Sequence, residues 1–340
     1  MHRTRRLLTC LALLLLPAGC GLPVAAAVPA PPPPPLATVA PGALQLWQDA
    51  AIFTVVRRLL DGARTGDPVW VEMYEFGRAD LAGALRQARD RGADVRVIVD
   101  RTVAASAATA DRLLAAGLAV RAYPVDDHRH QIDHVKLLLV GARALVGGMN
   151  WGTASFRNHD YAFETRSIPV LDRLRSIYLQ DWSLAGGSPA PIAPATGSVA
   201  QTTPGEEIRA RLTEELASAT RSVEAEVFVL TDPDVIAGLA AARRRGARVR
   251  VLLDPGQDVN RPNFDLLRAS GVEVRWYPVP PGAKLHAKAA LFDGRTLLVG
   301  SANWSLSGLS VNHELDLLFA DAPAASTFAS RFETDWSAGA

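Results

Sequence analysis

The chain repeats one short motif, which in its second half reads His286-Ala-Lys288-Ala-Ala-Leu-Phe-Asp293 and then Gly300-Ser301-Ala-Asn303-Trp304. The earlier copy reads His134-Val-Lys136 and then Gly147-Gly148-Met-Asn150-Trp151. A histidine and a lysine two positions apart on an extended segment point to the same face of a sheet. An imidazole can act as nucleophile or proton carrier near neutral pH, and an ammonium can hold a phosphate oxygen. Two such pairs brought together predict a site that attacks one phosphorus atom from opposite sides.

The repeat extends far beyond this motif. The segment 91–100 returns as 245–254, which is 154 positions later, and several single residues keep the same offset: Tyr123 and Tyr277, Asn158 and Asn312, Asp181 and Asp335. A constant offset over so many elements indicates a duplicated domain, and each half has an ordinary domain size. We expect one domain at 41–185 and another at 205–340. A linker rich in Pro, Gly, Ser and Thr joins them at 186–204.

In the first half, apolar segments typical of strands alternate with segments typical of helices. The strands are expected at 69–76, 95–99, 119–123, 134–140, 144–146 and 160–163, and the helices at 78–90, 108–116 and 170–182. The second half repeats this order. The alternation predicts an α/β protein made of two tandem α/β/α sandwich domains, related by pseudo-two-fold symmetry, with the active site at their interface.

The first 27 residues read as a signal segment rather than as part of the fold. Three arginines precede an apolar run at 7–16, which is short for a membrane span. We therefore expect export, with an uncleaved anchor as the alternative. Residues 16–20 resemble a bacterial lipobox, which would place a lipid on Cys20; cleavage after residues 25–27 is the other interpretation. A proline-rich spacer follows at 28–40.

Composition argues against nucleic-acid binding and against cysteine chemistry in the domains. Of 36 basic and 35 acidic residues, three arginines lie in the signal segment, so the remainder has a net charge of about −2. This is not the basic footprint of a nucleic-acid-binding protein, although a local cleft could still be positive. The only cysteines, Cys10 and Cys20, lie in the front segment, so the domains have neither a disulfide nor a cysteine zinc site.

The paired motifs resemble those of the phospholipase D superfamily, and the Asn-Trp tails are similar to its small cardiolipin-synthase-like members. The resemblance covers the chain from about Leu44 to Trp336. It implies a two-step exchange without cofactor or metal. One histidine attacks phosphorus and forms a phosphohistidine, and the other protonates the leaving alcohol and then activates water or an acceptor alcohol. By this pattern His134 is the nucleophile and His286 the general acid/base, an assignment that the residues alone leave open.

The resemblance also implies roles for the neighbouring residues. Lys136, Lys288, Asn150 and Asn303 hold phosphate oxygens, Asp160 and Glu314 accept hydrogen bonds from the imidazoles, and Ser301 and Asp293 are expected at the substrate. The first copy departs from the pattern. Val140-Gly141 stands where Phe292-Asp293 does, and Gly148 replaces Ser301. We expect these changes to affect geometry more than chemistry, the alternative being a catalytically impaired first half.

Other polar residues have plainer interpretations. The spacing His128-x-His130-x3-His134 is compatible with metal binding, but no second ligand set accompanies it and a polar loop is expected. His159 and His313 recur in register and are expected to pack or cap. Glu72 and Glu226, on the first expected strand of each half, either line the cleft or pair with a buried arginine. Asp100 and Asp254 end strands and are expected to cap turns.

These observations predict an exported, monomeric phosphodiesterase that hydrolyses or exchanges phospholipid head groups at a membrane surface. A secreted nuclease would use the same chemistry and is the first alternative. A degenerate, non-catalytic envelope binding protein is the second, although the intact His, Lys and Asn of both copies argue against it.

Overall fold

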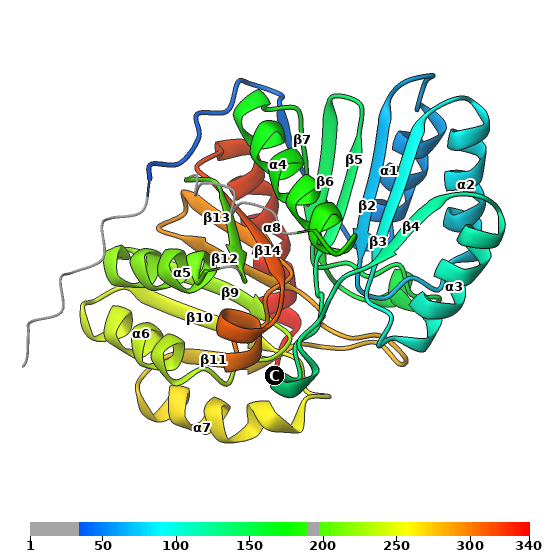
Figure 1. Ribbon diagram of the computed structural model, residues 1–340. Helices are drawn as coiled ribbons and strands as arrows, with labels where there is room; N and C mark the ends of the chain where they lie inside the picture. Colours follow the sequence, from blue (N-terminus) through cyan, green and yellow to red (C-terminus); the bar gives the residue numbers. More distant parts are fainter. Residues whose placement is uncertain (1–33, 189–196, 204) are drawn as a thin grey trace, which may run out of the picture. The chain divides into compact units, whose positions relative to one another are not determined.

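The computed structural model describes residues 34–188, 197–203 and 205–340 (Figure 1). The expected signal segment, with Cys20, and the first part of the expected spacer lie outside the described residues. Within the described part, no helix has the length and apolar character needed to cross a membrane.

Two seven-stranded sheets have the same strand order. The first runs β1-β7-β6-β5-β2-β3-β4 and the second, in the equivalent direction, β8-β14-β13-β12-β9-β10-β11. In each sheet three strands are parallel and the others antiparallel. The first sheet consists of β1 Leu44–Gln48, β2 Pro68–Met73, β3 Asp94–Val99, β4 Ala119–Ala122, β5 Lys136–Val140, β6 Arg143–Gly147 and β7 Tyr161–Thr165. The second consists of β8 Val199–Thr202, β9 Ser222–Val227, β10 Arg248–Leu253, β11 Glu273–Trp276, β12 Lys288–Phe292, β13 Thr296–Gly300 and β14 Glu314–Phe319.

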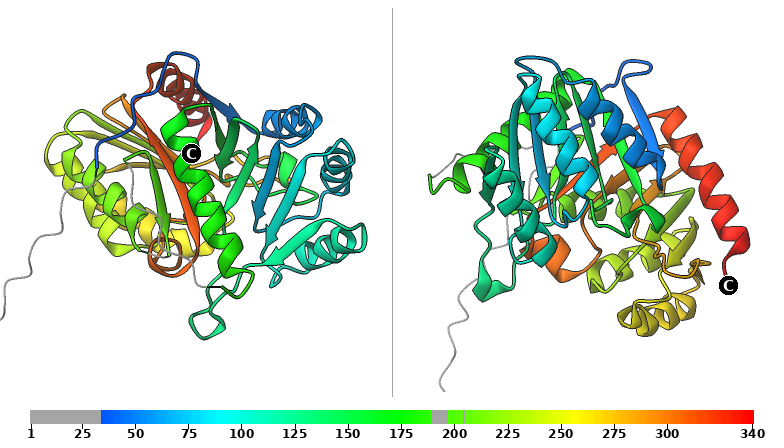
Figure 2. Two further views of the ribbon diagram at one scale, coloured as in Figure 1. Left: turned by 45° about the horizontal axis from the view of Figure 1, so that its top comes forward. Right: turned by 90° about the vertical axis from the view of Figure 1, so that its right-hand side faces the viewer.

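Helices cover both faces of each sheet (Figures 1 and 2). One outer core joins the first sheet to α1 Ala51–Asp61, α2 Ala79–Asp90 and α3 Ala104–Ala115, and the other joins the second sheet to α5 Glu207–Ser218, α6 Pro233–Arg244 and α7 Arg261–Ala269. A third, shared core contains side chains of both sheets together with α4 Ile168–Leu184 and α8 Ala322–Ala338. Short helical turns occur at η1 Asp127–Arg129, η2 Ser155–Arg157, η3 Asp258–Asn260 and η4 Ser307–Val311. The shared core is what holds the two halves together.

The strand that carries the first motif shows how the sequence specifies these layers. Leu137 and Leu139 of β5 enter the shared core, whereas Leu138 and Val140 enter the outer core. This alternation follows from the two-residue period of a strand, and the run is apolar throughout because both faces are covered. The same division occurs in β12.

The expected fold class is confirmed, and one expectation about its borders is corrected. Residues 199–202, which we placed in the linker, form the edge strand β8, paired antiparallel to β14. This pairing satisfies the backbone edge of β14, and the side chains of β8 are buried, with Val199 in the shared core and Ala200 in the outer core of the second sheet. Local Ser, Thr and Gly content suggested a linker, but tertiary pairing determined the conformation.

Candidate active site

Each His-Lys pair lies where an antiparallel strand begins beside the end of a parallel strand. Lys136 opens β5 opposite Met73, the last residue of β2, and Lys288 opens β12 opposite Val227, the last residue of β9. Both lysines therefore lie at the carboxyl ends of the parallel strands, the edge where ligand sites commonly form in such sheets. The histidines precede the strands by two residues.

The two histidines are held by acids of the opposite half. His134 Nδ1 lies 2.8 Å from Glu314 Oε2, and His286 Nδ1 lies 2.8 Å from Asp160 Oδ2. The backbone crosses in the same way, because His134 N donates to the carbonyl of His313 at 2.8 Å and His286 N donates to that of His159 at 2.8 Å. Each motif imidazole thus has its carboxylate partner in the opposite half.

The surroundings of both imidazoles favour the neutral form of the ring. Burial, together with the charge of Lys288, lowers the pKa of His286 to about 3, and burial with the charges of Lys136 and Lys288 lowers that of His134 well below its usual value. The acids fix the tautomer, since Nδ1–H faces a carboxylate and the lone pair therefore lies on Nε2, which in His286 is 3.2 Å from Lys288 Nζ. Each ring is therefore prepared as a nucleophile or base.

The lysines are poised to titrate near neutral pH. Burial lowers the pKa of Lys136 to about 7 and that of Lys288 to about 8. Lys288 Nζ donates to the carbonyl of His286 at 2.5 Å, and Lys136 Nζ donates to that of His134. Because each lysine also influences the histidine of the other half, all four groups share one electrostatic site.

Two asparagines complete the expected phosphate-binding set. Asn150 and Asn303 follow β6 and β13, and the side-chain oxygen of each is buried without a hydrogen-bond partner. A native protein seldom leaves buried amides unmatched. Because phosphate oxygens are acceptors, it is the Nδ2 group of each asparagine that would donate to a phosphate, and the Oδ1 atom that could accept from a hydroxyl.

Ser301 supports the acid rather than facing a substrate, which corrects our expectation. It is fully buried, its Oγ donates to Glu314 Oε2 at 2.6 Å, and it accepts from Leu315 N. Asn312 Nδ2 also donates to Glu314, at 3.0 Å. In the first half Gly148 stands instead, and a Cβ there would lie 2.3 Å from Asp160 Oδ1. The glycine leaves the space that the shorter acid needs.

Asp293, which we expected at the substrate, bonds to backbone groups instead. It follows the far end of β12, and its carboxylate accepts the backbone N–H groups of residues 220–222. Gly141 takes the same positive-φ position in the first half, with φ 54° against 53° for Asp293. Asp67 supplies the missing carboxylate there, accepting from Arg64 N at 2.8 Å beside Gly141. The lost motif aspartate is thus replaced from another position, remote from the histidines.

Asp100 and Asp254 have a role that the sequence suggested only in part. Each accepts a turn N–H, as expected, but each also accepts the N–H of the residue before a motif histidine: Asp133 N at 2.9 Å and Leu285 N at 2.7 Å. They fix the segment that delivers the imidazole.

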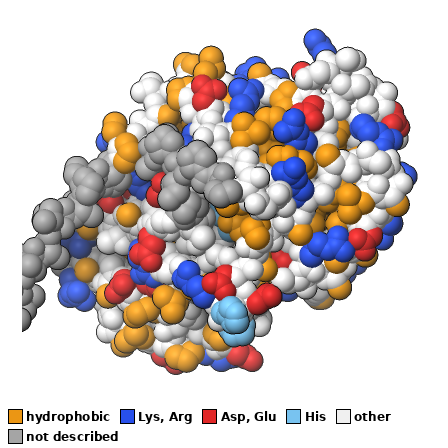
Figure 3. All heavy atoms as spheres, in the orientation of Figure 1, with side chains coloured by type: hydrophobic (Ala, Val, Ile, Leu, Met, Phe, Trp, Pro, Cys, Tyr) orange, Lys and Arg blue, Asp and Glu red, His pale blue; other side chains and the backbone are white. Residues whose placement is uncertain are grey.

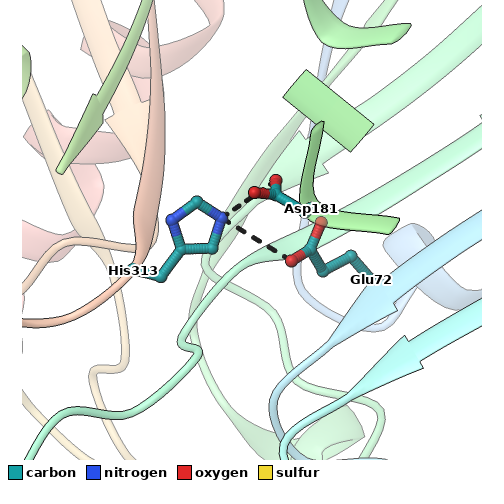
Figure 4. A group of neighbouring side chains, drawn as sticks. All are labelled: Glu72, Asp181 and His313. Carbon is teal, nitrogen blue, oxygen red and sulfur yellow. Dashed lines mark hydrogen bonds and ion pairs between the residues drawn. The ribbon is translucent and has the colours of Figure 1, made fainter. Parts of the chain in front are cut away.

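His128 and His130 lie exposed in and directly after η1. Among the described residues, two groups lie close enough together to hold a metal ion. One is Glu72, Asp181 and His313 (Figure 4), and the other is His159, Glu226 and Asp335. Glu72 and Glu226 therefore meet buried histidines, rather than the cleft or an arginine as we had expected.

The family described as "Cardiolipin synthase, PLD-like domain" matches residues 56–182 and again 212–336. A mitochondrial cardiolipin hydrolase of Chlamydomonas reinhardtii is 32% identical over 127 residues, covering 37% of this chain and 56% of that protein, so the match spans about half of that relative. A probable cardiolipin synthase of Bacillus subtilis is 24% identical over 307 residues, covering 78% of this chain and 61% of that protein.

The fold is also similar to solved structures. A phosphatidylserine synthase of Haemophilus influenzae superimposes with a TM-score of 0.70 over 89% of this chain and 87% of that one. The sequence identity is 14%, so this likeness concerns the fold alone. The two family matches cover both halves of the duplication that the sequence and the sheets display. The chain therefore belongs to the phospholipase D superfamily, as two tandem copies of its PLD-like domain.

Proposed function

We propose that the protein is a phosphodiesterase of phospholipase D type that cleaves or exchanges phospholipid head groups through a phosphohistidine. The observation that carries this proposal is the pair of neutral imidazoles, each held at Nδ1 by an acid of the other half and flanked by a lysine. This arrangement provides two reactive Nε2 atoms and two phosphate-binding cations in one site.

In the first step His134 Nε2 forms a bond to phosphorus while the bond to the head-group oxygen breaks, and that oxygen takes a proton from His286. In the second step His286 accepts a proton from water or an acceptor alcohol, whose oxygen displaces His134. Lys136, Lys288 and the two asparagines stabilise the negative charge on the five-coordinate transition state. Glu314 and Asp160 keep each ring oriented and stabilise the imidazolium that forms.

To act as an acid, His286 must carry a proton, which its surroundings disfavour. Burial and the neighbouring lysine charge depress the pKa of His286. A bound phosphodiester anion offsets the lysine charge, so substrate binding raises the pKa of the imidazole. The proton is therefore acquired together with the substrate.

A phospholipid is the substrate we propose. The relatives named above are a cardiolipin hydrolase and a probable cardiolipin synthase. On the face seen in Figure 3, Lys and Arg are interspersed with Asp and Glu rather than gathered into one basic track that would suit a polyanion. Export by residues 1–27 and action as a monomer at a membrane surface belong to the same proposal.

Product analysis tests this function. The purified protein is incubated with vesicles of phosphatidylglycerol, phosphatidylcholine and cardiolipin, and separately with single-stranded DNA, always with a chelator. We expect phosphatidic acid or phosphatidyl products from the vesicles, and diversion to a phosphatidyl alcohol when a primary alcohol is added, because any hydroxyl can open the phosphohistidine. Cleavage of DNA alone would replace the proposal with the nuclease. Activity restored only by a divalent ion would contradict the metal-free mechanism.

A further inference from the structure

Two histidines outside the reacting set occupy equivalent positions immediately before the two catalytic acids: His159 before Asp160 and His313 before Glu314. Each lies where the halves cross. His313 N donates to the carbonyl of Ile132 at 2.9 Å, and its own carbonyl accepts from His134 N. His159 makes the equivalent contacts with residues 284 and 286. Any shift of these histidines would move a catalytic acid and the opposite catalytic histidine together.

Oxygen atoms face both nitrogens of each ring. His313 Nδ1 lies 2.6 Å from the carbonyl oxygen of Thr203, and Nε2 lies 3.1 Å from Asp181 Oδ2 (Figure 4). His159 Nδ1 lies 2.6 Å from Asp49 Oδ1, and Nε2 lies 2.8 Å from Glu226 Oε2. A neutral imidazole has only one N–H, so only an imidazolium can donate to two acceptors.

The surroundings also favour a cation. His313 stacks on Tyr123 with ring centroids 4.6 Å apart, and His159 stacks on Tyr277 at 5.2 Å. A π face attracts positive charge. Behind His313 Nε2, both oxygens of Glu72 and Asp181 Oδ1 are buried without a hydrogen-bond partner. Burial and the charges of Asp181 and Asp133 raise the pKa of Glu72 well above its usual value, and an imidazolium at His313 opposes that rise.

We propose that His159 and His313 are positioning residues that act as buried imidazolium ions. Each holds the catalytic acid that follows it, Asp160 or Glu314, in place against the opposite half. The inference rests on the phosphodiesterase function proposed above. The direction of the histidine pKa values agrees. Burial alone would lower the pKa of His159, but Glu226 and Asp49 raise it to about 10, and Asp181 and Glu72 likewise raise the pKa of His313 well above its usual value.

His159 and His313 differ in the cations that surround them. Around His159, Arg331 bonds to Asp49 at 2.9 Å and to Asp335 at 2.6 Å, so a second cation shares the acidic cluster. The position equivalent to Arg331 is Ile177, and Asp133 stands where the other cluster has Leu285. Among the described residues, neither Glu72 nor Asp181 forms an ion pair with a lysine or arginine. Loss of His313 therefore leaves more uncompensated charge than loss of His159.

The titratable groups that face His313 and His159 determine the charge of each imidazole. Glu72, Asp133, Asp181 and Tyr123 surround His313, from β2, the segment before β5, α4 and the segment after β4. Those around His159 are Asp49, Tyr161, Glu226, Tyr277, Arg331 and Asp335. None of them is removed by the variants proposed below except Glu72, which is changed deliberately.

The charge is measured on the wild-type protein by NMR titration of ¹⁵N-labelled histidine rings, which does not require catalytic activity. We expect both nitrogens of His159 and His313 to stay protonated from pH 6 to 8. A neutral ring at pH 7, or a divalent metal that copurifies with the protein and binds at Nε2, would overturn the proposal.

Activity then tests positioning. On the chromogenic diester bis(p-nitrophenyl) phosphate, H313Q is expected to lower kcat tenfold to hundredfold with KM within about twofold. H159Q has a smaller effect, and H130Q is the matched control. Adding E72Q to H313Q removes the unmatched carboxylate and should restore most of kcat, which a purely local packing defect would not do. An unrestored double variant that folds, as judged by thermal unfolding, would contradict the charge role. If H313Q does not fold, or wild type does not turn over the diester, the NMR titration still decides the charge.

Discussion

The two halves of this protein have the same strand order and the same reactive groups, yet they support those groups differently. The second half contributes Glu314, held by Ser301 and Asn312, to the histidine of the first half. The first half contributes the shorter Asp160, for which Gly148 leaves room. After duplication the reacting atoms were retained while the supports diverged. Because each imidazole is bonded to an acid of the opposite half, a substitution near the acid of one half should change the properties of the imidazole in the other half.

The largest effect is expected from either catalytic histidine. His134→Ala and His286→Ala should each lower kcat by a factor on the order of 10⁴ to 10⁶, and the double variant should be little worse, because the residues act as one unit. Steady-state kinetics with vesicle substrate measure this, with His128→Ala as the exposed control. A His134→Ala variant with near-normal turnover would show that the halves are not equivalent partners in the chemistry.

Substitutions of the residues beside the two acids should affect the two halves to different extents. Gly148→Ala puts a methyl group against Asp160 and should lower kcat by about a hundredfold, since the acid must move away from His286. Ser301→Ala removes one hydrogen bond to Glu314 and should cost roughly tenfold. The comparison is made on kcat at saturating substrate. Equal, negligible effects would mean that the acids do not depend on these neighbours.

Several of these differences could be predicted from the sequence and several could not. The reactive residues were predictable because each motif places them at fixed spacing on one strand. The pairing of each imidazole with an acid of the opposite half was not predictable, because His134 and Glu314 lie 180 residues apart and meet only in the folded protein. The replacement of the motif aspartate by Asp67 was also hidden, because its equivalent position holds Arg221. Strand β8 was not predicted, because its extended conformation is stabilised by pairing with β14 rather than by its own residues.

The pH dependence should reveal the unequal lysines. Their pKa values, lowered to about 7 for Lys136 and about 8 for Lys288, lie far below the ordinary 10.5. Each is charged below its pKa, so kcat/KM should fall severalfold as pH rises through 7 to 8 and phosphate binding weakens. Lys136→Arg keeps its charge at higher pH and should move this alkaline limb upward, at some cost in rate. A flat profile from pH 6.5 to 9 would contradict the lowered pKa values.

The smallest effect on activity is expected at the far end of the motif strands. Asp293→Asn, and Asp67→Asn in the first half, should lower the free energy of unfolding by about 1 kcal/mol by weakening bonds to backbone N–H groups. Neither should change kcat by more than about twofold. Denaturant unfolding and kinetics on the same samples test both statements, and a large loss of kcat with unchanged stability would return Asp293 to the active site.

The crossed pairing of imidazole and acid is tested most directly by ¹⁵N NMR of the histidine rings in two variants. Glu314→Gln should shift the ring signals of His134 and leave those of His286 nearly unchanged, whereas Asp160→Asn should do the reverse, because each acid bonds Nδ1 of the opposite half. If each substitution instead perturbs the histidine of its own half, the pairs are not crossed and the account of a site shared between the halves is wrong.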